Sequence, residues 1–285
     1  MTNSLELTGI HVWRNTVRLG YPVLESFLST IDMVDEVVLC VDPTSDGETI
    51  RLARAIQDKF DKVNLVWFEW PIGTSGDGRV IGVASSFALQ QARTSHVINI
   101  QGDEIYGSEL SSHIKENWRG WARDGIECIR FKVLNLESNM QEYQGGGNWD
   151  WQTGSGYNHS YKLCKKCLNT RYIHDAWSFD WNGFVHADAI FSEKFPIVHA
   201  HNNFRDSLID LRQAAANEIW TDDKYGPMYK KFADDLEESQ KQWYDDPKWT
   251  RTDSPFGYLI PDFAKGILGQ TRYAPNYDLL ERWPL

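Results

Sequence analysis

The sequence has no long hydrophobic run and carries little positive charge. None of its 285 residues belongs to an apolar stretch of the roughly 18 residues that a membrane span needs. Residues 1–6 lack the basic and apolar regions of a secretory signal peptide. The formal net charge of −11 opposes indiscriminate binding to nucleic acid or anionic membranes, although a local basic groove could survive it. We therefore expect a cytoplasmic protein without a membrane span.

Cysteine is scarce, and its spacing does not suggest a disulfide framework. The four cysteines are Cys40, Cys128, Cys164 and Cys167. Cys40 lies in an apolar segment and is expected to be a reduced core residue. Cys164 and Cys167 have the spacing of half a zinc knuckle, but no second half lies nearby, so a zinc site is the lesser alternative. Reduced cysteines fit a reducing cytosol.

Two common phosphate-binding motifs are also absent. No Gly-x-Gly-x-x-Gly follows the first predicted strand, and no Gly-Lys-Ser or Gly-Lys-Thr occurs anywhere. The dinucleotide and P-loop modes of phosphate binding are therefore unsupported. The chain has no internal repeat and no low-complexity linker, which favours a single main domain.

Aromatic residues, in contrast, are abundant: the chain has 13 Trp, 12 Tyr and 13 Phe. Tryptophan in polar surroundings, as in residues 148–151 (Asn-Trp-Asp-Trp), often forms a platform on which sugar rings or bases stack. Packing of the loop itself explains the same residues equally well.

The first hundred residues alternate between strand and helix patterns. Strands separated by helices of ten to fifteen residues predict right-handed βαβ units and a parallel sheet, so the fold class is α/β. The predicted strands are residues 10–13, 37–41, 63–67 and 97–100, the predicted helices are 23–31, 48–60 and 80–92, and 73–78 is a glycine-rich loop.

The pattern changes after residue 125. We predict a long loop at residues 142–159, a charged helical region at 206–243 and an irregular, proline-containing remainder. Further strands are predicted at 126–136, 161–168, 179–184 and 196–201.

The strand at residues 97–100 stops at a glycine flanked by polar and acidic residues, in the order Gln101, Gly102, Asp103 and Glu104. Open α/β sheets bind ligands at this carboxyl edge. Two adjacent carboxylates repel each other, so a positive charge should lie beside them, most simply a divalent cation that carries a phosphate. The alternative is a solvated acidic pair that opens a helix.

Two other loops are expected at the same edge, because they follow neighbouring parallel strands. Arg14 and Asn15 end the first strand, and residues 42–47 follow the second. Asp42 suits hydrogen bonds to a pyrimidine or ribose edge, or alternatively caps its own turn.

Together these segments resemble glycosyltransferase family 2 of the GT-A fold. The resemblance implies a Rossmann-like, mixed but mainly parallel sheet flanked by helices, with a nucleotide-sugar and acceptor domain at residues 1–205 and a helical or irregular extension packed on it at 206–285. The resemblance covers about the first 110 residues. Residues 14–20 resemble the segment with the family's opening arginine, and residues 41–42 with 45–49 resemble its Asp-x-Ser-x-Asp-Gly-Thr turn. Residues 100–104 resemble its Asp-x-Asp metal motif.

The resemblance also implies roles for individual residues. Asp42 should contact the nucleotide base, with Arg14, Asn15, Asp46 and Gln101 also lining the nucleotide site. Asp103 should bind Mn²⁺ or Mg²⁺. Because Gln101 stands where the family has its first acid, coordination shifts to Glu104 and to His199 and His201, which alternate along a predicted strand and so face one side.

An inverting transfer also needs a base that deprotonates the acceptor hydroxyl. The resemblance places it after the metal motif, where Asp175 and Asp180 lie among aromatic residues that would raise their pKa. Arg205 could bind a phosphate through two hydrogen bonds or form a surface ion pair.

The sequence thus predicts a metal-dependent glycosyltransferase, hexosyl or pentosyl, that uses a nucleoside-diphosphate sugar, with a UDP-sugar favoured. Alternatives are a sugar nucleotidyltransferase and a glycan-binding module on a degenerate fold. The acceptor stays open among glycans, lipids, proteins, small molecules and a hydroxymethylated base in phage-type DNA. The DNA option depends on stacking residues and a basic run, namely Trp149, Trp151, Trp177 and Trp181 with Lys162, Lys165, Lys166 and Arg171.

Overall fold

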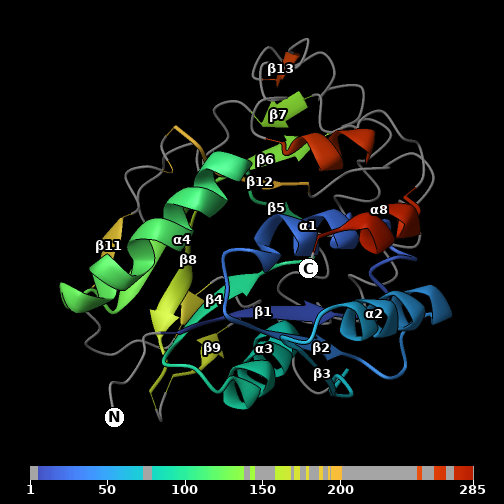
Figure 1. Cartoon of the computed structure of the whole chain (residues 1–285), viewed down its shortest axis with the longest axis horizontal. Helices are drawn as coiled ribbons and strands as arrows, with labels where there is room; N and C mark the ends of the chain where they lie inside the picture. The colour runs from blue at the N-terminus through green and yellow to red at the C-terminus, as the bar shows by residue number, and fades with distance from the viewer. Residues whose placement is uncertain are drawn as a thin grey trace, which may run out of the picture.

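The structure is a computed structural model, shown in Figure 1. It describes residues 6–72, 79–137, 142–144, 158–167, 170–173, 178–179, 186–188, 192, 194–200, 249–251, 260–267 and 273–284.

Four parallel strands form the first half of the sheet, in the spatial order β3-β2-β1-β4. The three helices that join them follow the predicted alternation closely, which confirms the βαβ units. The strands are β1 (Leu7–Trp13), β2 (Glu36–Val41), β3 (Val63–Trp67) and β4 (His96–Ile100), and the helices are α1 (Val23–Ile31), α2 (Gly47–Lys59) and α3 (Arg79–Gln91).

The strand order reverses at β1. From β1 the chain moves to β2 and β3 on one side, and then returns to add β4 on the other side. The connections leaving the carboxyl ends of β1 and β4 therefore run in opposite directions, and this is the position at which doubly wound sheets bind their ligands. The loops after β1, β2 and β4 lie at this edge, as the sequence predicts.

The second half of the sheet is largely antiparallel. Strand β8 pairs with β4 and with β6, while β12 runs parallel to β6 and antiparallel to β5. The prediction of an α/β fold with a mixed sheet is thus confirmed. The remaining bounds are β5 (Glu104–Ile105), β6 (Cys128–Glu137), β7 (Glu142–Gln144), β8 (Asn158–Lys165), β9 (Tyr172–Ile173), β10 (Ser178–Phe179), β11 (His186–Asp188), β12 (Ile197–His199) and β13 (Trp249–Arg251).

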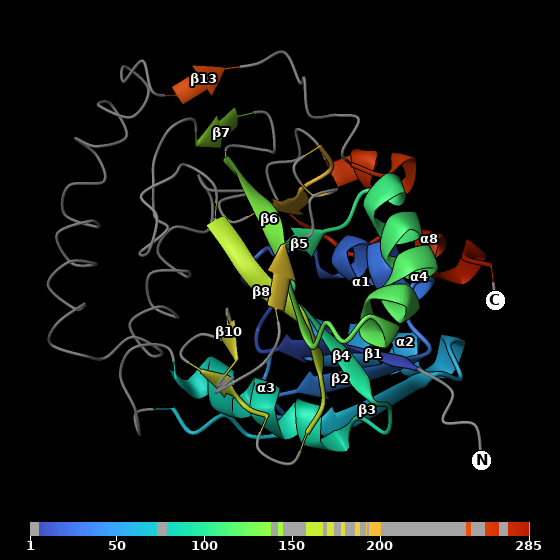
Figure 2. The same cartoon turned by 90° about the vertical axis from the view of Figure 1, so that its left-hand side faces the viewer.

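Helices cover both faces of the sheet (Figure 2), with α1, α2, α4 (Ser108–Arg123) and α8 (Tyr277–Arg282) on one face and α3 on the other. Alternate residues of a strand point to opposite faces. In β2, Val37, Leu39 and Val41 pack on the first face, whereas Val38 and Cys40 pack on the α3 face. Both faces of β1, β2 and β4 are therefore buried, whereas β3 at the edge of the sheet is partly exposed.

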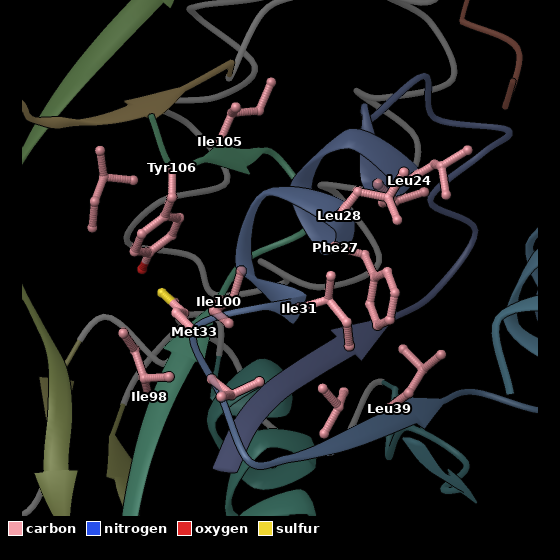
Figure 3. Packing of buried hydrophobic residues seen from close by; sticks show 14 of the residues in the cluster. Leu24, Phe27, Leu28, Ile31, Met33, Leu39, Ile98, Ile100, Ile105 and Tyr106 are labelled. Carbon is pink, nitrogen blue, oxygen red and sulfur yellow. The ribbon is translucent and has the colours of Figure 1, made fainter. Parts of the chain in front are cut away.

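The core between α1 and the sheet supports the carboxyl edge. Figure 3 shows Leu24, Phe27 and Leu28 of α1 in the same packed layer as Ile98 and Ile100 of β4. This layer continues into Ile105 and Tyr106, directly after the acidic motif. The motif is thus bordered by buried hydrophobic residues on both sides in the sequence.

Two parts of the sequence-based interpretation are wrong. The predicted loop at 142–159 contains strand β7 and the start of β8. Helix α4 is not predicted at all, although Leu110, Ile114 and Trp118 recur every four residues and are its buried residues.

The described part of the carboxyl terminus packs against the first half of the chain. It contains the 3₁₀ helix η3 (Asp262–Ile267) and α8, and Tyr273 and Leu280 join the core beside α1 and α2. The Lys59 ammonium donates to the carbonyl of Glu281 at 2.8 Å. Residues 206–243, predicted to be helical, lie outside the described residues. Within the described chain, no helix combines the length and apolarity that crossing a bilayer requires.

Candidate active site at the carboxyl edge of the sheet

The acidic motif forms a tight turn after β4. The backbone N–H of Glu104 donates to the carbonyl of Gln101 at 3.0 Å, and the N–H of Gln101 donates to Glu104 Oε2 at 3.0 Å. From α1, the Ser26 hydroxyl donates to the same Gln101 carbonyl at 2.9 Å. A Cβ on Gly102 would lie 2.8 Å from Val23 Cγ1, so only glycine fits between the turn and α1.

Strand pairing brings His199 to this turn. In the β5–β12 pair His199 is opposite Glu104, and the Ala200 N–H donates to the Asp103 carbonyl at 2.7 Å. His199 Nε2 lies 3.2 Å from Asp103 Oδ2, with 18% and 13% of the two side chains exposed. Two of the predicted metal ligands, far apart in the sequence, therefore meet at the carboxyl edge and remain accessible.

The environment of His199 favours its protonated form. Burial lowers the pKa of this imidazole, but the charge and hydrogen bond of Asp103 outweigh burial, and the net direction is upward. A cation bound between the two side chains would displace this proton.

Glu104, the other predicted acidic ligand, points elsewhere. Its Oε1 lies 2.5 Å from Lys162 Nζ, and the two side chains are only 2% and 1% exposed. Since Oε2 accepts from Gln101, both carboxylate oxygens contact protein groups. Lys162, which the sequence placed in a basic surface run, is therefore buried, and that expectation is wrong for this residue.

Asp42 lies at the end of β2 and is almost fully buried. Its Oδ2 lies 3.2 Å from Arg14 Nε and accepts the backbone N–H of Trp70. Its Oδ1 accepts both the N–H and the hydroxyl of Thr44, at 2.8 and 2.7 Å. The turn-capping contact, one of the two interpretations of Asp42, is thus present, and a nucleotide base would have to share or replace one of these contacts.

The loops after β1 and β2 are joined to each other. Asn15, in the left-handed region with φ of 54°, accepts the N–H of Asp46 through its side-chain oxygen at 2.8 Å. The Asp46 carboxylate in turn caps α2 by accepting from the N–H groups of Glu48 and Thr49. Two predicted nucleotide-site residues therefore fix the relative positions of the two loops.

Several predicted site residues lie outside the described residues. They are the two candidate bases, the second candidate histidine ligand and the candidate phosphate ligand, namely Asp175, Asp180, His201 and Arg205.

Asp103 and His199 fit a divalent cation as a pair. Among the described residues, no group of three or more His, Cys, Asp and Glu side chains is arranged to hold a metal ion. The Asp103 carboxylate is the kind of ligand that Mn²⁺ and Mg²⁺ take, and Mg²⁺ commonly keeps several waters and is bound through one or two carboxylates and substrate phosphates. His199 could add a nitrogen ligand beside it.

The described cysteines do not form a metal site. All four are free, and Cys40, Cys128 and Cys164 are buried. The Cys167 thiol lies 2.8 Å from the Thr170 hydroxyl. The expectation of reduced cysteines is consistent with this arrangement.

Lys162 is part of the site, although no motif in the sequence marks it. Its neighbours Leu163 and Tyr161 belong to the hydrophobic clusters on opposite faces of the sheet, so this part of β8 is covered on both faces. A lysine buried in such a strand requires an acidic partner, but which acid lies beside it depends on the strand pairing.

Comparison with known proteins gives only distant structural similarity. No family model matches the chain, and no curated protein sequence matches it. The structure of S. aureus TarS 1–349 matches with a TM-score of 0.42 and 13% sequence identity, over 77% of this chain and 66% of that chain. The structure of TarS 1–349 in complex with UDP-GlcNAc matches with a TM-score of 0.32 and 16% sequence identity, over 47% of this chain and 34% of that chain. The chain thus spans less than two thirds of these TarS chains.

A third similar structure is a Bacillus anthracis chain provisionally described as a glucose-1-phosphate thymidylyltransferase, in complex with a sucrose. Its TM-score is 0.37 at 12% identity, over 56% of this chain and 71% of that one. At these scores the similarities say nothing about activity.

Proposed function

We propose that this chain is a metal-dependent glycosyltransferase that moves a sugar from a nucleoside-diphosphate sugar, preferably a UDP-sugar, to an acceptor hydroxyl with inversion. The observation that carries the proposal is the meeting of Asp103 and His199 at the carboxyl edge, where the strand order reverses. An accessible carboxylate–imidazole pair at such an edge is suited to a cation that carries a diphosphate.

In this proposal Asp103 and His199 hold Mn²⁺ or Mg²⁺, with His201 as a further ligand. A cation there supplies positive charge against the departing diphosphate. The nucleotide lies along the joined loops, where Arg14, Asn15, Asp42, Asp46 and Gln101 are the candidate contacts, and Arg205 is the candidate phosphate ligand.

The acceptor hydroxyl needs a general base, for which Asp180 and Asp175 are the candidates. The acceptor class and the choice between hexose and pentose stay open, with a hydroxymethylated DNA base among the candidates. We place the protein in the cytoplasm. No contact of the described residues favours a nucleotidyltransferase or a non-catalytic glycan-binding module.

The first prediction concerns Asp103. Asp103→Asn keeps the shape of the side chain but removes the anionic ligand, so we expect UDP binding to lose its dependence on Mn²⁺ and donor hydrolysis to fall at least 100-fold, within the range for losing a central electrostatic group. Calorimetry with UDP, with and without Mn²⁺, and a hydrolysis assay across UDP-, GDP- and dTDP-sugars measure both effects.

Asp262→Asn is the matched control, because Asp262 is exposed on η3 and pairs only with the nearby Lys265 among its described contacts. Undiminished turnover in Asp103→Asn would contradict the proposed function. Glycan binding that needs neither nucleotide nor metal would instead favour the binding module.

A further inference from the structure

Glu104, the last residue of the acidic motif, forms a buried ion pair with Lys162. The pair joins β5 to β8, two elements that belong to different parts of the sheet. With 2% and 1% of their side chains exposed, both charges are removed from water. Such a pair adds little to the free energy of unfolding, because the cost of removing both charges from water offsets most of their attraction. Its main effect is then to hold the residues around it in one conformation.

The arrangement that it fixes is the turn that presents Asp103. The Glu104 carboxylate is held on one oxygen by Lys162 and on the other by the N–H of Gln101, the first residue of the turn. Ser26 and Ala200 hold the turn from outside, through the carbonyls of Gln101 and Asp103. The Glu104 carboxylate is thus an internal support for the turn, with both oxygens held by protein groups.

The pair also resolves the charge conflict in the motif. Asp103 and Glu104 are adjacent in sequence, and two free carboxylates there would repel each other. The Lys162 ammonium compensates Glu104 internally, whereas Asp103 faces His199 and remains 13% exposed. The two acids therefore have separate partners.

We propose that Glu104 is not a metal ligand and that Glu104 and Lys162 form a positioning pair. The pair sets the turn so that, among the described acidic and imidazole groups, only Asp103 and His199 face the cation. This inference rests on the proposed function for the role of the cation. It replaces the sequence-based expectation that Glu104 assists Asp103.

Three variants test the positioning pair: Glu104→Gln, Lys162→Met and the double variant. Each single variant leaves one buried charge uncompensated, so we expect Mn²⁺ binding in the presence of UDP to weaken at least tenfold. The double variant replaces the ion pair by a neutral pair of similar size, and we expect its Mn²⁺ affinity to return to within about threefold of wild type. A true ligand could not be rescued in this way.

Lys165→Met is the matched control, because Lys165 lies on the same strand but is half exposed and pairs with Glu127 at the surface. A double variant that binds Mn²⁺ as weakly as Asp103→Asn overturns the proposal. So does Glu104→Gln that binds Mn²⁺ normally, because the support would then be dispensable.

A metal-free measurement separates this proposal from the proposed function. Amide hydrogen exchange of the peptide that covers residues 100–106 should accelerate at least tenfold in Lys162→Met and recover in the double variant, with chelator present. Wild-type protein that binds neither Mn²⁺ nor UDP counts against the glycosyltransferase, while exchange in Lys162→Met equal to that of wild type counts against the positioning pair.

Discussion

Neighbouring residues of one motif can differ in their exposure and in their partners. Asp103 is partly exposed and faces an imidazole, whereas Glu104, the next residue, is buried against an ammonium. Asp103 lies in the turn before β5, whereas Glu104 is the first residue of that buried strand, which accounts for the difference in exposure. A run of two acids therefore need not form one site.

The positions of Asp103 and His199 were predictable, whereas the partner of Glu104 was not. Both predicted residues lie at ends of apolar segments, and the ends of strands in such a sheet gather at its edges. The Lys162 contact depends on β8 lying beside β4 in antiparallel orientation. Local periodicity does not contain that pairing, since it reports which face a residue occupies but not which strand is its neighbour.

Glu25 gives a prediction about pH. Burial raises its pKa to about 7, against the opposing hydrogen bond from Tyr273. In the unfolded chain the carboxyl titrates near its ordinary value of 4.5. As pH rises from 4.5 to 7, ionisation of the buried carboxyl therefore lowers the free energy of unfolding progressively, and above that range the loss is complete. We expect Glu25→Gln to raise the unfolding free energy by about 2–3 kcal/mol at pH 8 and by almost nothing at pH 4.

Thermal unfolding at several pH values measures this difference. Glu48→Gln is the control, because Glu48 is exposed and pairs with Arg51 at the surface. A stabilisation that is the same at pH 4 and pH 8 would show that ionisation of Glu25 is not its cause.

At the scale of elements, the loops at the carboxyl edge are positioned by the ends of helices and strands. The predicted helices α1, α2 and α3 all exist, because each has a continuous apolar stripe. The short strand β5 has no such local signal, whereas β12 lies within the strand predicted at residues 196–201. The pairing of β5 with β12 depends on the whole sheet and is not predictable from local periodicity.

Asp46 has two candidate roles that can be distinguished by experiment: it caps helix α2, and it is a predicted nucleotide contact. As the N-cap of α2 it accepts two backbone N–H groups and the Thr49 hydroxyl. We expect Asp46→Ala to lower the unfolding free energy by about 1–2 kcal/mol, as loss of an N-cap does. UDP affinity should fall less than tenfold, because the Asp46 N–H that binds Asn15 is retained.

Denaturant unfolding and UDP calorimetry on the same samples distinguish the two roles. Asn276→Ala removes the N-cap of the short helix α8 and serves as the control for capping. A large loss of UDP affinity with unchanged stability would mean that Asp46 acts mainly as a nucleotide contact.

At the scale of the whole molecule, the described end of the chain connects to the motif through α1. The Tyr273 hydroxyl accepts the N–H of Leu24 at 3.1 Å and donates to Glu25 at 2.8 Å. The next residue of α1, Ser26, donates its hydroxyl to the carbonyl of Gln101. A residue near the carboxyl terminus therefore fixes the amino-terminal end of the helix against which the acidic motif is packed.

Tyr273→Phe tests this connection with the removal of one oxygen. The variant leaves the Leu24 N–H and the Glu25 carboxyl buried without this hydroxyl, so we expect a loss of about 1–3 kcal/mol in unfolding free energy. Because the hydroxyl joins distant segments, limited proteolysis should also cleave after residue 260 sooner than in wild type. Tyr277→Phe, whose ring would still lie under Arg51, controls for loss of a tyrosine hydroxyl in the same segment. If both variants unfold and are cleaved like wild type, the carboxyl-terminal segment is held by apolar packing of residues such as Leu280, and α1 holds the motif without it.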